Sequence, residues 1–371
     1  MRLALREMRR RPGRFTIATV ILTLIAILLM FLGGLLDGLV ASSTGAFRAQ
    51  RADLLVYSAS SRNALERSRI EPSVRQQVEE VSGVARVGGL GSVQLGGRVP
   101  GRGPRDLVPT ALFGYELAPR GLPATPPPVG SVYADDSLKA KDVKLGTTIH
   151  LGPARSAVTV VGFVSDSRYS GQGTLWGSLG TWRQVLNANR PDARVGPGVV
   201  QVLVVQATPK GRAGLAQRID QATSGATTTL TISQAINALP GVTQQQTVFN
   251  QIIGVTVMIA IVVVALFFAL LTVERTALYG VLKAIGASSR TLFAGVVLQA
   301  VIVALIASAI GIVASLALNA LIPPGTIPFV ATPARLLGSA AVLVLAAVVG
   351  CAFSLRRVLR IDPAAAIGGT A

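Results

Sequence analysis

The sequence predicts a membrane α-helical protein with four transmembrane helices and a large α+β extracytoplasmic domain inserted between helices 1 and 2. Its composition is the first observation behind this fold class. Of its 371 residues, 50% are hydrophobic and only 14% are charged, whereas a soluble domain usually carries about 25% charged residues. Four uncharged runs are the second observation, because about 20 apolar residues in a helix span the hydrocarbon core of a bilayer. These runs are residues 15–36, 249–273, 291–322 and 336–355.

Basic residues are concentrated in the short segments beside these runs. Residues 1–14 carry six Arg, residues 274–290 carry three basic side chains, and the tail from residue 356 carries three more. Short loops rich in Lys and Arg stay cytoplasmic, whereas long domains do not follow this rule. We therefore expect a multi-pass protein with both termini in the cytoplasm and residues 37–247 outside. The rest of the net charge of +18 is dispersed, which argues against nucleic acid as a partner.

The uncharged runs divide the chain into segments. In chain order, the predicted segments are a cytoplasmic amphipathic N-terminus (1–14), transmembrane helix 1 with a stalk (15–52), the extracytoplasmic α+β domain (53–243), a second stalk with transmembrane helix 2 (244–273), a short cytoplasmic helix (274–290), transmembrane helix 3 (291–322), transmembrane helix 4 (335–355) and a cytoplasmic tail (356–371).

The large domain alternates strand-like and helix-like stretches, which is why we expect the α+β class and two lobes. β-Branched runs bounded by Gly, Pro or Asp predict strands, and Gly/Pro-rich stretches predict loops. The predicted strands are Leu54–Tyr57, Val158–Val164 and Val199–Val205; the helices are Ser73–Val81, Thr181–Asn187 and Gly211–Thr223; the loops are Gly96–Pro104 and Pro119–Pro128. Ala46–Asp53 and Gln244–Gln251 are predicted to extend the first two membrane helices as stalks.

The sequence predicts no enzyme. A phosphate-binding loop needs a Lys after a Gly, and none of the five Lys residues follows one. The chain holds one His and one Cys, which excludes a zinc site built from these residues. His150 lies in a strand-like segment and is expected to be structural. We therefore expect no catalytic residue, no metal site and no cofactor bound by this chain.

The membrane runs contain few polar side chains. Ionisable residues inside a bilayer mark ion or proton routes, and Asp37 lies only at the outer end of the first run. Gln299 and Asn319 are expected to form hydrogen bonds between helices. Small residues are frequent in the third and fourth runs. These helices are therefore predicted to pack closely rather than to conduct.

The segment 274–290 interrupts the apolar sequence with a short charged helix. Leu278, Leu282 and Ile285 have the spacing of one helix face, and Gly286 is a natural end for the helix. Glu274, Arg275 and Lys283 fall outside this face. Such a helix either lies in the lipid interface or inserts its apolar face into a groove on a partner, and the residues alone favour neither.

VERTALYGVLKAIGASSRTLF, residues 273–293, resembles the segment after the second span in ABC-transporter permeases of the MacB/FtsX type. That family typically has E-R-x-x-E-x-G-x-L-K-A-I-G-A-S; this chain departs at Leu278 and Tyr279, where the family usually has Glu-Ile. RVLRIDPAAAIG and LALREMRRRPGRF are similar to the family's closing pattern and N-terminal helix. Three stretches of the large domain, LLVYSASSRNALERSRI, VYADDSLKAKDVKLGTTIHLG and VVGFVSDSRYSGQGTLWGSLGTWRQV, look most like the small single permeases of the DevC and HrtB type, the latter haem exporters.

The resemblance implies a homodimeric permease in the bacterial plasma membrane, embedded in the lipid bilayer and bound to a cytoplasmic ABC ATPase that carries ATP and Mg²⁺. In such permeases the segment 274–290 transmits the ATPase motion to the outer domain. The cargo expected is a hydrophobic or amphipathic compound such as haem, a lipid or a peptide antibiotic. The alternative is an FtsX-like regulatory role, in which the motion activates a cell-wall hydrolase or a sensor kinase. An apolar pocket near the outer membrane surface favours efflux, and an exposed docking surface without a pocket favours regulation.

If the chain is similar to haem exporters, the cargo is expected where the first two helices leave the bilayer. Phe47, Tyr57 and Phe249 are the residues predicted to contact it. A phenol can ligate iron, so Tyr169 is a further candidate, against a plain packing role for the same side chain.

Overall fold

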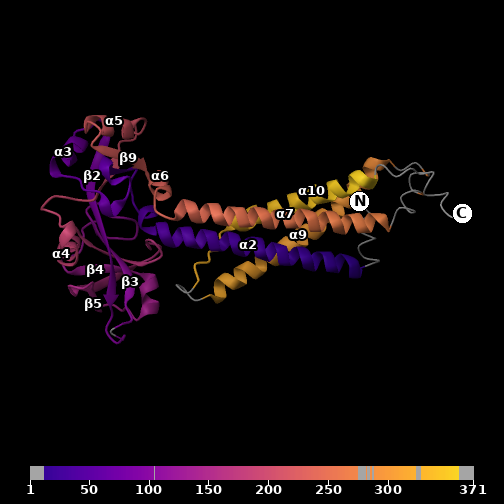
Figure 1. Ribbon diagram of the computed structural model, residues 1–371, viewed down its shortest axis with the longest axis horizontal. Helices are drawn as coiled ribbons and strands as arrows, with labels where there is room; N and C mark the ends of the chain where they lie inside the picture. Colours follow the sequence, from indigo (N-terminus) through magenta and orange to yellow (C-terminus); the bar gives the residue numbers. More distant parts are fainter. Residues whose placement is uncertain are drawn as a thin grey trace. The chain divides into compact units, whose positions relative to one another are not determined.

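The computed structural model describes residues 12–103, 105–274, 281, 285, 288–322 and 327–358 (Figure 1). The chain divides into two compact units. We call Met1–Gly38 with Gln246–Ala371 the membrane unit, and Leu39–Gln245 the α+β unit.

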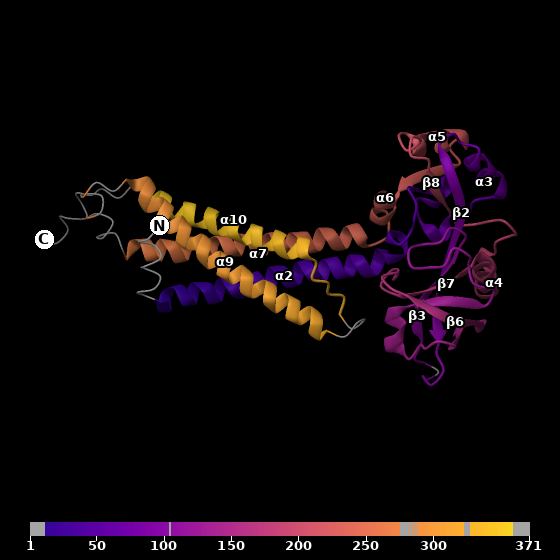
Figure 2. The same ribbon diagram turned by 180° about the vertical axis from the view of Figure 1, so that it is seen from behind.

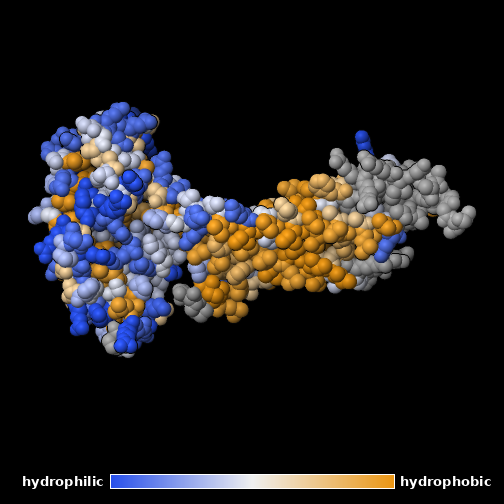
Figure 3. Space-filling view, viewed as in Figure 1, coloured by the Kyte–Doolittle hydropathy of each residue, from blue (hydrophilic) through white to orange (hydrophobic). Residues whose placement is uncertain are grey.

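The four predicted transmembrane helices are confirmed as long apolar helices: α2 (Pro12–Arg48), α7 (Val242–Val273), α9 (Ser289–Leu321) and α10 (Pro333–Val358). Their apolar windows have mean hydropathies between 2.5 and 3.0. Figure 3 shows an almost continuous apolar surface over these helices. Large side chains such as Leu24, Met258 and Val313 are more than 60% exposed on it. A helix that exposes this much apolar surface is stable in lipid, where its backbone groups are satisfied internally.

Small residues let the membrane helices approach closely, as expected from the sequence. A Cβ on Gly350 of α10 would lie 2.5 Å from the carbonyl oxygen of Ile261 in α7, and one on Gly311 of α9 would lie 3.0 Å from Ala26 in α2. Backbone contact of this kind is typical of helix packing in membranes. The buried core of the unit takes small and branched side chains from all four helices.

The two polar residues singled out in the spans have different positions. Gln299 is buried, with 4% of its surface exposed. Asn319 accepts a hydrogen bond of 3.2 Å from the backbone N–H of Ala331. The prediction of a bond between helices is therefore wrong for Asn319, because the side chain lies at the end of α9 and its donor is in the segment that leads into α10.

The α+β unit is built on a nine-stranded sheet with the order β3-β7-β4-β6-β5-β2-β8-β1-β9. Since β2 also pairs with β3, six strands form a closed ring, and β2 is shared with the remaining strands β8, β1 and β9. This sharing gives the unit its two lobes. The strands are β1 (Leu54–Ser58), β2 (Val84–Arg98), β3 (Val108–Tyr115), β4 (Ser131–Asp135), β5 (Thr148–Leu151), β6 (Ser156–Val164), β7 (Gly173–Ser178), β8 (Val202–Ala207) and β9 (Thr227–Thr231).

The helices of this unit are short. They are α3 (Pro72–Glu79), α4 (Leu179–Asn189), α5 (Leu215–Ala222) and α6 (Ile232–Asn237), with 3-10 turns η1 (Ala59–Ser61), η2 (Leu65–Arg67), η3 (Asp136–Lys141) and η4 (Pro191–Ala193). Each predicted strand and helix is present with shifted ends. The strand predicted at Val199–Val205 begins only at Val202 and continues to Ala207.

The loop predicted at Gly96–Pro104 is wrong at its start, because β2 continues to Arg98. The glycines there serve packing rather than a turn. A Cβ on Gly97 would lie 2.9 Å from Ile149, and one on Gly91 would lie 2.4 Å from the indole of Trp182 in α4. Glycine-rich strands mark places where another group approaches the backbone closely.

The first stalk is shorter than predicted. The helix α2 ends at Arg48, and the following residues lead into the sheet, where Asp53 N–H donates to the carbonyl of Val205. The Gln-rich stretch Gln244–Gln251 is helical, as predicted, and forms the start of α7. Figure 2 shows α7, α9 and α10 from the other side.

Candidate functional site

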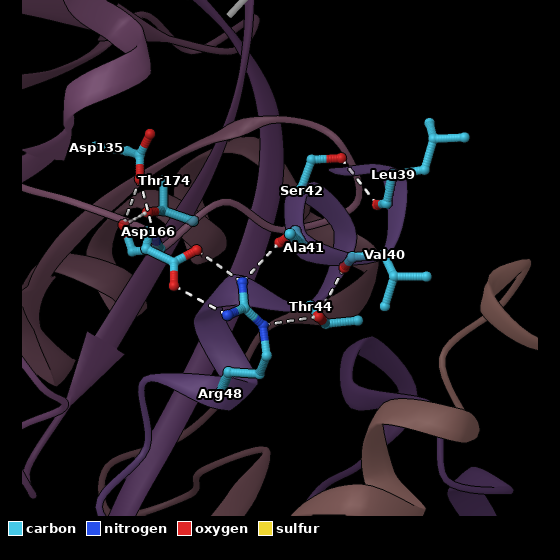
Figure 4. Close-up of polar contacts among 10 residues, drawn as sticks. Leu39, Val40, Ala41, Ser42, Thr44, Arg48, Asp135, Asp166 and Thr174 are labelled. Atoms are coloured by element: carbon cyan, nitrogen blue, oxygen red, sulfur yellow. Dashed lines mark hydrogen bonds and ion pairs between the residues drawn. The ribbon is translucent and has the colours of Figure 1, made fainter. Parts of the chain in front are cut away.

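The last turns of α2 are fixed to the loop between β6 and β7 by Arg48 (Figure 4). Its guanidinium forms two parallel hydrogen bonds to Asp166, at 2.9 Å from Nη1 and 2.7 Å from Nη2. Nη2 also donates to the carbonyl of Ala41 and Nε to the hydroxyl of Thr44. Arginine has five N–H donors, and four of these are used here. This side chain therefore joins the helix end to one loop of the α+β unit with a defined geometry.

Backbone contacts reinforce the same junction. Ala46 N–H donates to the carbonyl of Arg168 at 3.1 Å, and Ser170 N–H donates to the carbonyl of Ser43 at 3.1 Å. Gly45 permits this approach, since a Cβ there would lie 2.8 Å from both N and O of Arg168. We call Gly45, Arg48 and residues 166–171 the α2 clamp.

A buried hydrogen-bond network holds the loop of the α2 clamp at Ser167. Asp135 is 2% exposed and accepts hydrogen bonds from the N–H and the hydroxyl of Ser167, at 3.0 and 2.7 Å. The Ser167 hydroxyl also contacts that of Thr174, which accepts a bond from the indole of Trp176. A fully satisfied network of this kind rigidifies its surroundings, so the loop holds the last turns of α2 in one geometry.

The membrane unit holds a second arginine–carboxylate pair, between Asp37 in the C-terminal third of α2 and Arg335 in the first turn of α10. Arg335 donates from Nε to Oδ2 of Asp37 at 3.1 Å and from Nη2 to Oδ1 at 2.5 Å. The hydroxyl of Thr332 donates to the same carboxylate. The side chain of Asp37 is 24% exposed and that of Arg335 is 35% exposed. Nη1 of Arg335 has no hydrogen-bond partner among the described residues.

Glycines in α2 allow the segment before α10 to lie on the helix. A Cβ on Gly33 would lie 2.7 Å from Cδ of Arg335, and one on Gly34 would lie 2.4 Å from the ring of Phe329. Val330 N–H donates to the carbonyl of Gly34 at 3.0 Å, and Phe329 stacks on Phe31 at 5.7 Å between ring centroids. The position of Arg335 is therefore fixed by contacts on both sides of it.

This pair borders a cavity of about 400 Å³ in the membrane unit. We call it the outer-leaflet cavity, because Asp37 and Arg335 flank the first and fourth uncharged runs on the side predicted to be the outer one. Its walls include Leu29, Ile253 and Val342. The volume falls within the roughly 300–1,000 Å³ of small-molecule sites, which are mostly apolar with a few polar groups that orient the ligand.

Most of the residues predicted to contact the ATPase, namely Arg275, Leu278, Leu282, Lys283 and Gly286, lie outside the described residues. Glu274 follows α7, with its N–H bonded to the carbonyl of Leu270 at 3.1 Å. Ile285 N–H donates to the carbonyl of Val281 at 3.0 Å, a helical bond. The side chain of Ile285 is 78% exposed, so it is available for contact.

Three of the predicted cargo residues lie together in the core of the α+β unit. Phe47 and Tyr57 are 1% exposed and Tyr169 is 4% exposed, with the rings of Phe47 and Tyr169 5.7 Å apart. Phe249 lies in α7 and is partly exposed.

Burial also bears on the idea that Tyr169 ligates iron. Burial raises the pKa of the Tyr169 phenol far above its usual value, and the carboxylate of Glu66 raises it further. Burial raises the pKa of Tyr57 in the same way. Burial therefore disfavours the charged phenolate, which is the form that binds iron, at both positions. This favours the packing role that the sequence left open for Tyr169.

Neither Arg335 nor the α2 clamp was predicted from the sequence. A signal for Arg335 exists, because Asp37 directly follows the first uncharged run and Arg335 directly precedes the fourth. In the predicted topology both positions lie on the outer side of the membrane, where opposite charges can pair. Arg48 and Asp166 are 118 residues apart, and no sequence pattern connects them.

Known proteins resemble this chain in part or over its full length. Residues 250–363 match the family model described as FtsX-like permease C-terminal. A protein of Staphylococcus haemolyticus named hemin transport system permease protein HrtB is 22% identical over 371 residues, which cover 100% of this chain and 99% of the relative. An ABC transporter permease of Mycobacterium bovis is 41% identical over 115 residues, 30% of this chain and 31% of that relative. Among solved structures, the periplasmic region of MacB from Actinobacillus actinomycetemcomitans is 12% identical, covers 50% of this chain and 92% of its own, and has a TM-score of 0.35.

The family match falls on the three membrane helices that follow the α+β unit and on the segment 274–290 between the first two of them. The likeness to the HrtB protein extends over the whole chain. Relatives of this kind are permease subunits, which are not catalytic. Together these matches support an ABC transporter permease of the MacB/FtsX type.

Proposed function

We propose that this permease is driven by a separate cytoplasmic ATPase and expels a hydrophobic or amphipathic compound, such as haem, a lipid or a peptide antibiotic. The observation that carries the proposal is the outer-leaflet cavity of about 400 Å³. Its apolar walls suit the body of an amphipathic molecule. Arg335, whose Nη1 has no partner among the described residues, suits a carboxylate or phosphate on that molecule, since arginine binds such groups bidentately.

Haem fits this description, because it combines an apolar ring with carboxylates. The likeness to a protein named for hemin transport adds support for this candidate. An anionic phospholipid has the same combination of groups. The regulatory alternative, in which the motion activates a cell-wall hydrolase or a sensor kinase, calls for a docking surface and gives the outer-leaflet cavity no role. Efflux is therefore the function favoured by the membrane unit.

The ATPase is proposed to bind the segment 274–290. Leu278, Leu282 and Ile285 would occupy an apolar groove on the ATPase, and Glu274, Arg275 and Lys283 would contact its rim. Ile285 is 78% exposed, which supports contact between its apolar side chain and the ATPase. ATP and Mg²⁺ belong to that partner.

Co-purification of the ATPase with variants of the full chain tests this coupling. Burying a Leu side chain contributes about 1.5–3 kcal/mol, so Leu282→Ala should weaken ATPase binding by roughly tenfold or more. An exposed charge contributes about 0–1 kcal/mol, so Lys283→Ala is the matched mild variant. Full ATPase binding and full ATP turnover with Leu282→Asp would contradict the coupling role.

The proposal also includes a homodimer in the bacterial plasma membrane with both termini cytoplasmic. Orientation can be tested by thiol labelling, because Cys351 is the single cysteine of the chain and is buried. In a Cys351→Ser background, an impermeant reagent should label Ser60→Cys in intact cells and leave Ile285→Cys unlabelled; both positions are exposed. Labelling of Ile285→Cys from outside would reverse the arrangement.

A further inference from the structure

The shared strand β2 leaves part of one edge without a neighbouring strand. On one edge, β3 pairs with β2 from Leu90 to Gly97. On the opposite edge, β8 pairs as far as Leu90 and β5 begins only at Gly97. Residues 91–96 therefore have no strand beside them on this second edge. We call this opening the fork of the sheet; in Figure 2, β2 runs between the labels of β8 and β3.

Part of the backbone at the fork has free hydrogen-bonding capacity, although the N–H of Ser92 already donates to the side-chain oxygen of Gln201. Alternate residues of an antiparallel strand direct both backbone polar groups to the same edge. The carbonyls of Leu90 and Gly96 accept bonds from Gln201 and Gly152 at 3.2 and 3.0 Å, so the even-numbered residues face the fork. The N–H and C=O of Gln94 consequently face it too. Neither has a backbone partner there in the part of the chain that the structure describes.

A cavity of about 200 Å³ lies at the fork. At about 30 Å³ per water molecule, this equals roughly six or seven waters, so the cavity suits a small polar group or a chain end. Ser92 lines it and is 1% exposed, and its hydroxyl has no hydrogen-bond partner among the described residues. A buried hydroxyl without a partner is costly, and a ligand would supply one. The charged residues that line the cavity are Glu66, Arg69, Arg190 and Asp192.

Arg69 is the cation best placed to receive an anion. Its guanidinium donates only to backbone carbonyls, those of Glu66, Ser68 and Ala193. These bonds use three of its five donors, and no carboxylate accepts from it within the described residues. Burial lowers the pKa of this guanidinium, which indicates that its charge is poorly compensated. A carboxylate in the cavity would provide that compensation.

We propose that the fork binds the free carboxyl end of an extended peptide. The terminal carboxylate would pair with Arg69 and Arg190, and the last peptide group would bond to the backbone of Gln94, as an added strand does. The apolar side chains of Val93 and Leu186, which also line the cavity, favour a small last residue. Glu66 and Asp192 disfavour multiply charged anions such as phosphate. This proposal is independent of the efflux proposal, because none of these residues lines the outer-leaflet cavity.

Isothermal titration of the full chain in lipid nanodiscs with trialanine tests the proposal. We expect saturable binding of trialanine and at least tenfold weaker binding of trialanine amide, because hydrogen bonds to charged groups are the strong ones. Arg69→Ala should weaken trialanine binding at least tenfold. Arg86→Ala is the matched control, because Arg86 is exposed on β2 and does not line the cavity. This variant should bind trialanine as tightly as the wild type does.

Arg190→Ala provides a second test, since Arg190 is exposed and its removal should leave the fold intact. It should weaken trialanine binding at least threefold. Three results would overturn the proposal: no saturable binding of trialanine to the wild type, equal affinity for trialanine and its amide, or unchanged affinity in Arg190→Ala. Acetate binding as tight as trialanine would also overturn it, because the strand edge would then contribute nothing.

Discussion

The two arginine–carboxylate pairs use the same bidentate geometry in different surroundings. In the α2 clamp, Arg48 directs four N–H groups to Asp166, Ala41 and Thr44. In the membrane unit, Arg335 directs two N–H groups to Asp37 and borders a cavity of about 400 Å³. Backbone hydrogen bonds lie beside both pairs, but the second pair also borders the outer-leaflet cavity.

The difference separates a mechanical role from a binding role. A guanidinium with most of its donors engaged holds one geometry and has little to offer a ligand. A guanidinium with free donors beside an apolar cavity can bind a further acceptor. A ligand shifts a conformational equilibrium only if it binds one state better than the other. We therefore expect a ligand to act on the pair in the membrane unit and not on the α2 clamp.

The largest effect is expected from Gly45→Val, which should push α2 away from the loop 166–171 in the α2 clamp. The added side chain would meet backbone atoms of Arg168 at 2.8 Å, and backbone cannot move aside as a side chain can. Overpacking costs about 1–3 kcal/mol, and we expect the upper end. Trp176 and Trp182 are the two tryptophans of the chain, so urea unfolding followed by fluorescence reports on the α+β unit. Gly103→Val is the control, because a Cβ there meets no atom within 4 Å; equal midpoints for both variants would contradict a close-packed clamp.

A smaller loss is expected from Asp37→Ala, which leaves Arg335 without its counter-charge. Breaking a fully buried pair costs about 3–5 kcal/mol; because this pair is partly exposed, we expect about 1–3 kcal/mol. The single Cys351 is buried in α10, so a thiol-reactive dye added during heating reports on the membrane unit. The double variant Asp37→Ala/Arg335→Ala should recover most of the loss. An unchanged melting temperature in Asp37→Ala would show that the pair is not formed.

The smallest effect is expected from Asp166→Asn. The side chain of Asp166 is 67% exposed, and exposed pairs contribute about 0–1 kcal/mol. The amide oxygen can still accept one bond from Arg48. Urea unfolding should therefore shift little, and 1 M salt should shift the wild type by a similar amount because it screens exposed charges. A loss above about 2 kcal/mol would mean that the ion pair, rather than the backbone bonds and Gly45, holds the α2 clamp.

The membrane helices could be predicted from the sequence because lipid imposes a simple requirement. Every span must be long and uncharged, so Phe15–Leu36 and Phe249–Val273 indicated α2 and α7 without further information. The α+β class followed from β-branched runs such as Val158–Val164. Each of these patterns lies within one short stretch of sequence, so it can be recognised without knowing which distant residues pack against it.

The order of the strands and the two arginine pairs could not be predicted, because they depend on residues far apart in the chain. The loop predicted at Gly96–Pro104 overlaps the end of β2. A glycine in the sequence does not reveal whether it forms a turn or makes room for a neighbouring side chain, as Gly97 does for Ile149. The predicted cargo residues Phe47, Tyr57 and Tyr169 share a buried core, which an aromatic residue near a helix end does not reveal. Asp37 was noticed in the sequence, but its partner Arg335 was not.

Ligand-stimulated ATP turnover of the reconstituted complex tests the central claim most directly. The permease and its ATPase are placed in nanodiscs with haem, an anionic phospholipid or a peptide antibiotic, and turnover is measured for the wild type, Gly338→Leu and Gly295→Leu. Gly338 lines the outer-leaflet cavity and Gly295 does not, and a Cβ on either meets no atom within 4 Å. We predict that at least one compound stimulates the wild type and Gly295→Leu, and that Gly338→Leu loses this stimulation while keeping basal turnover. Equal stimulation of all three proteins, or stimulation of none by any of the compounds, would contradict a cargo site in the membrane unit.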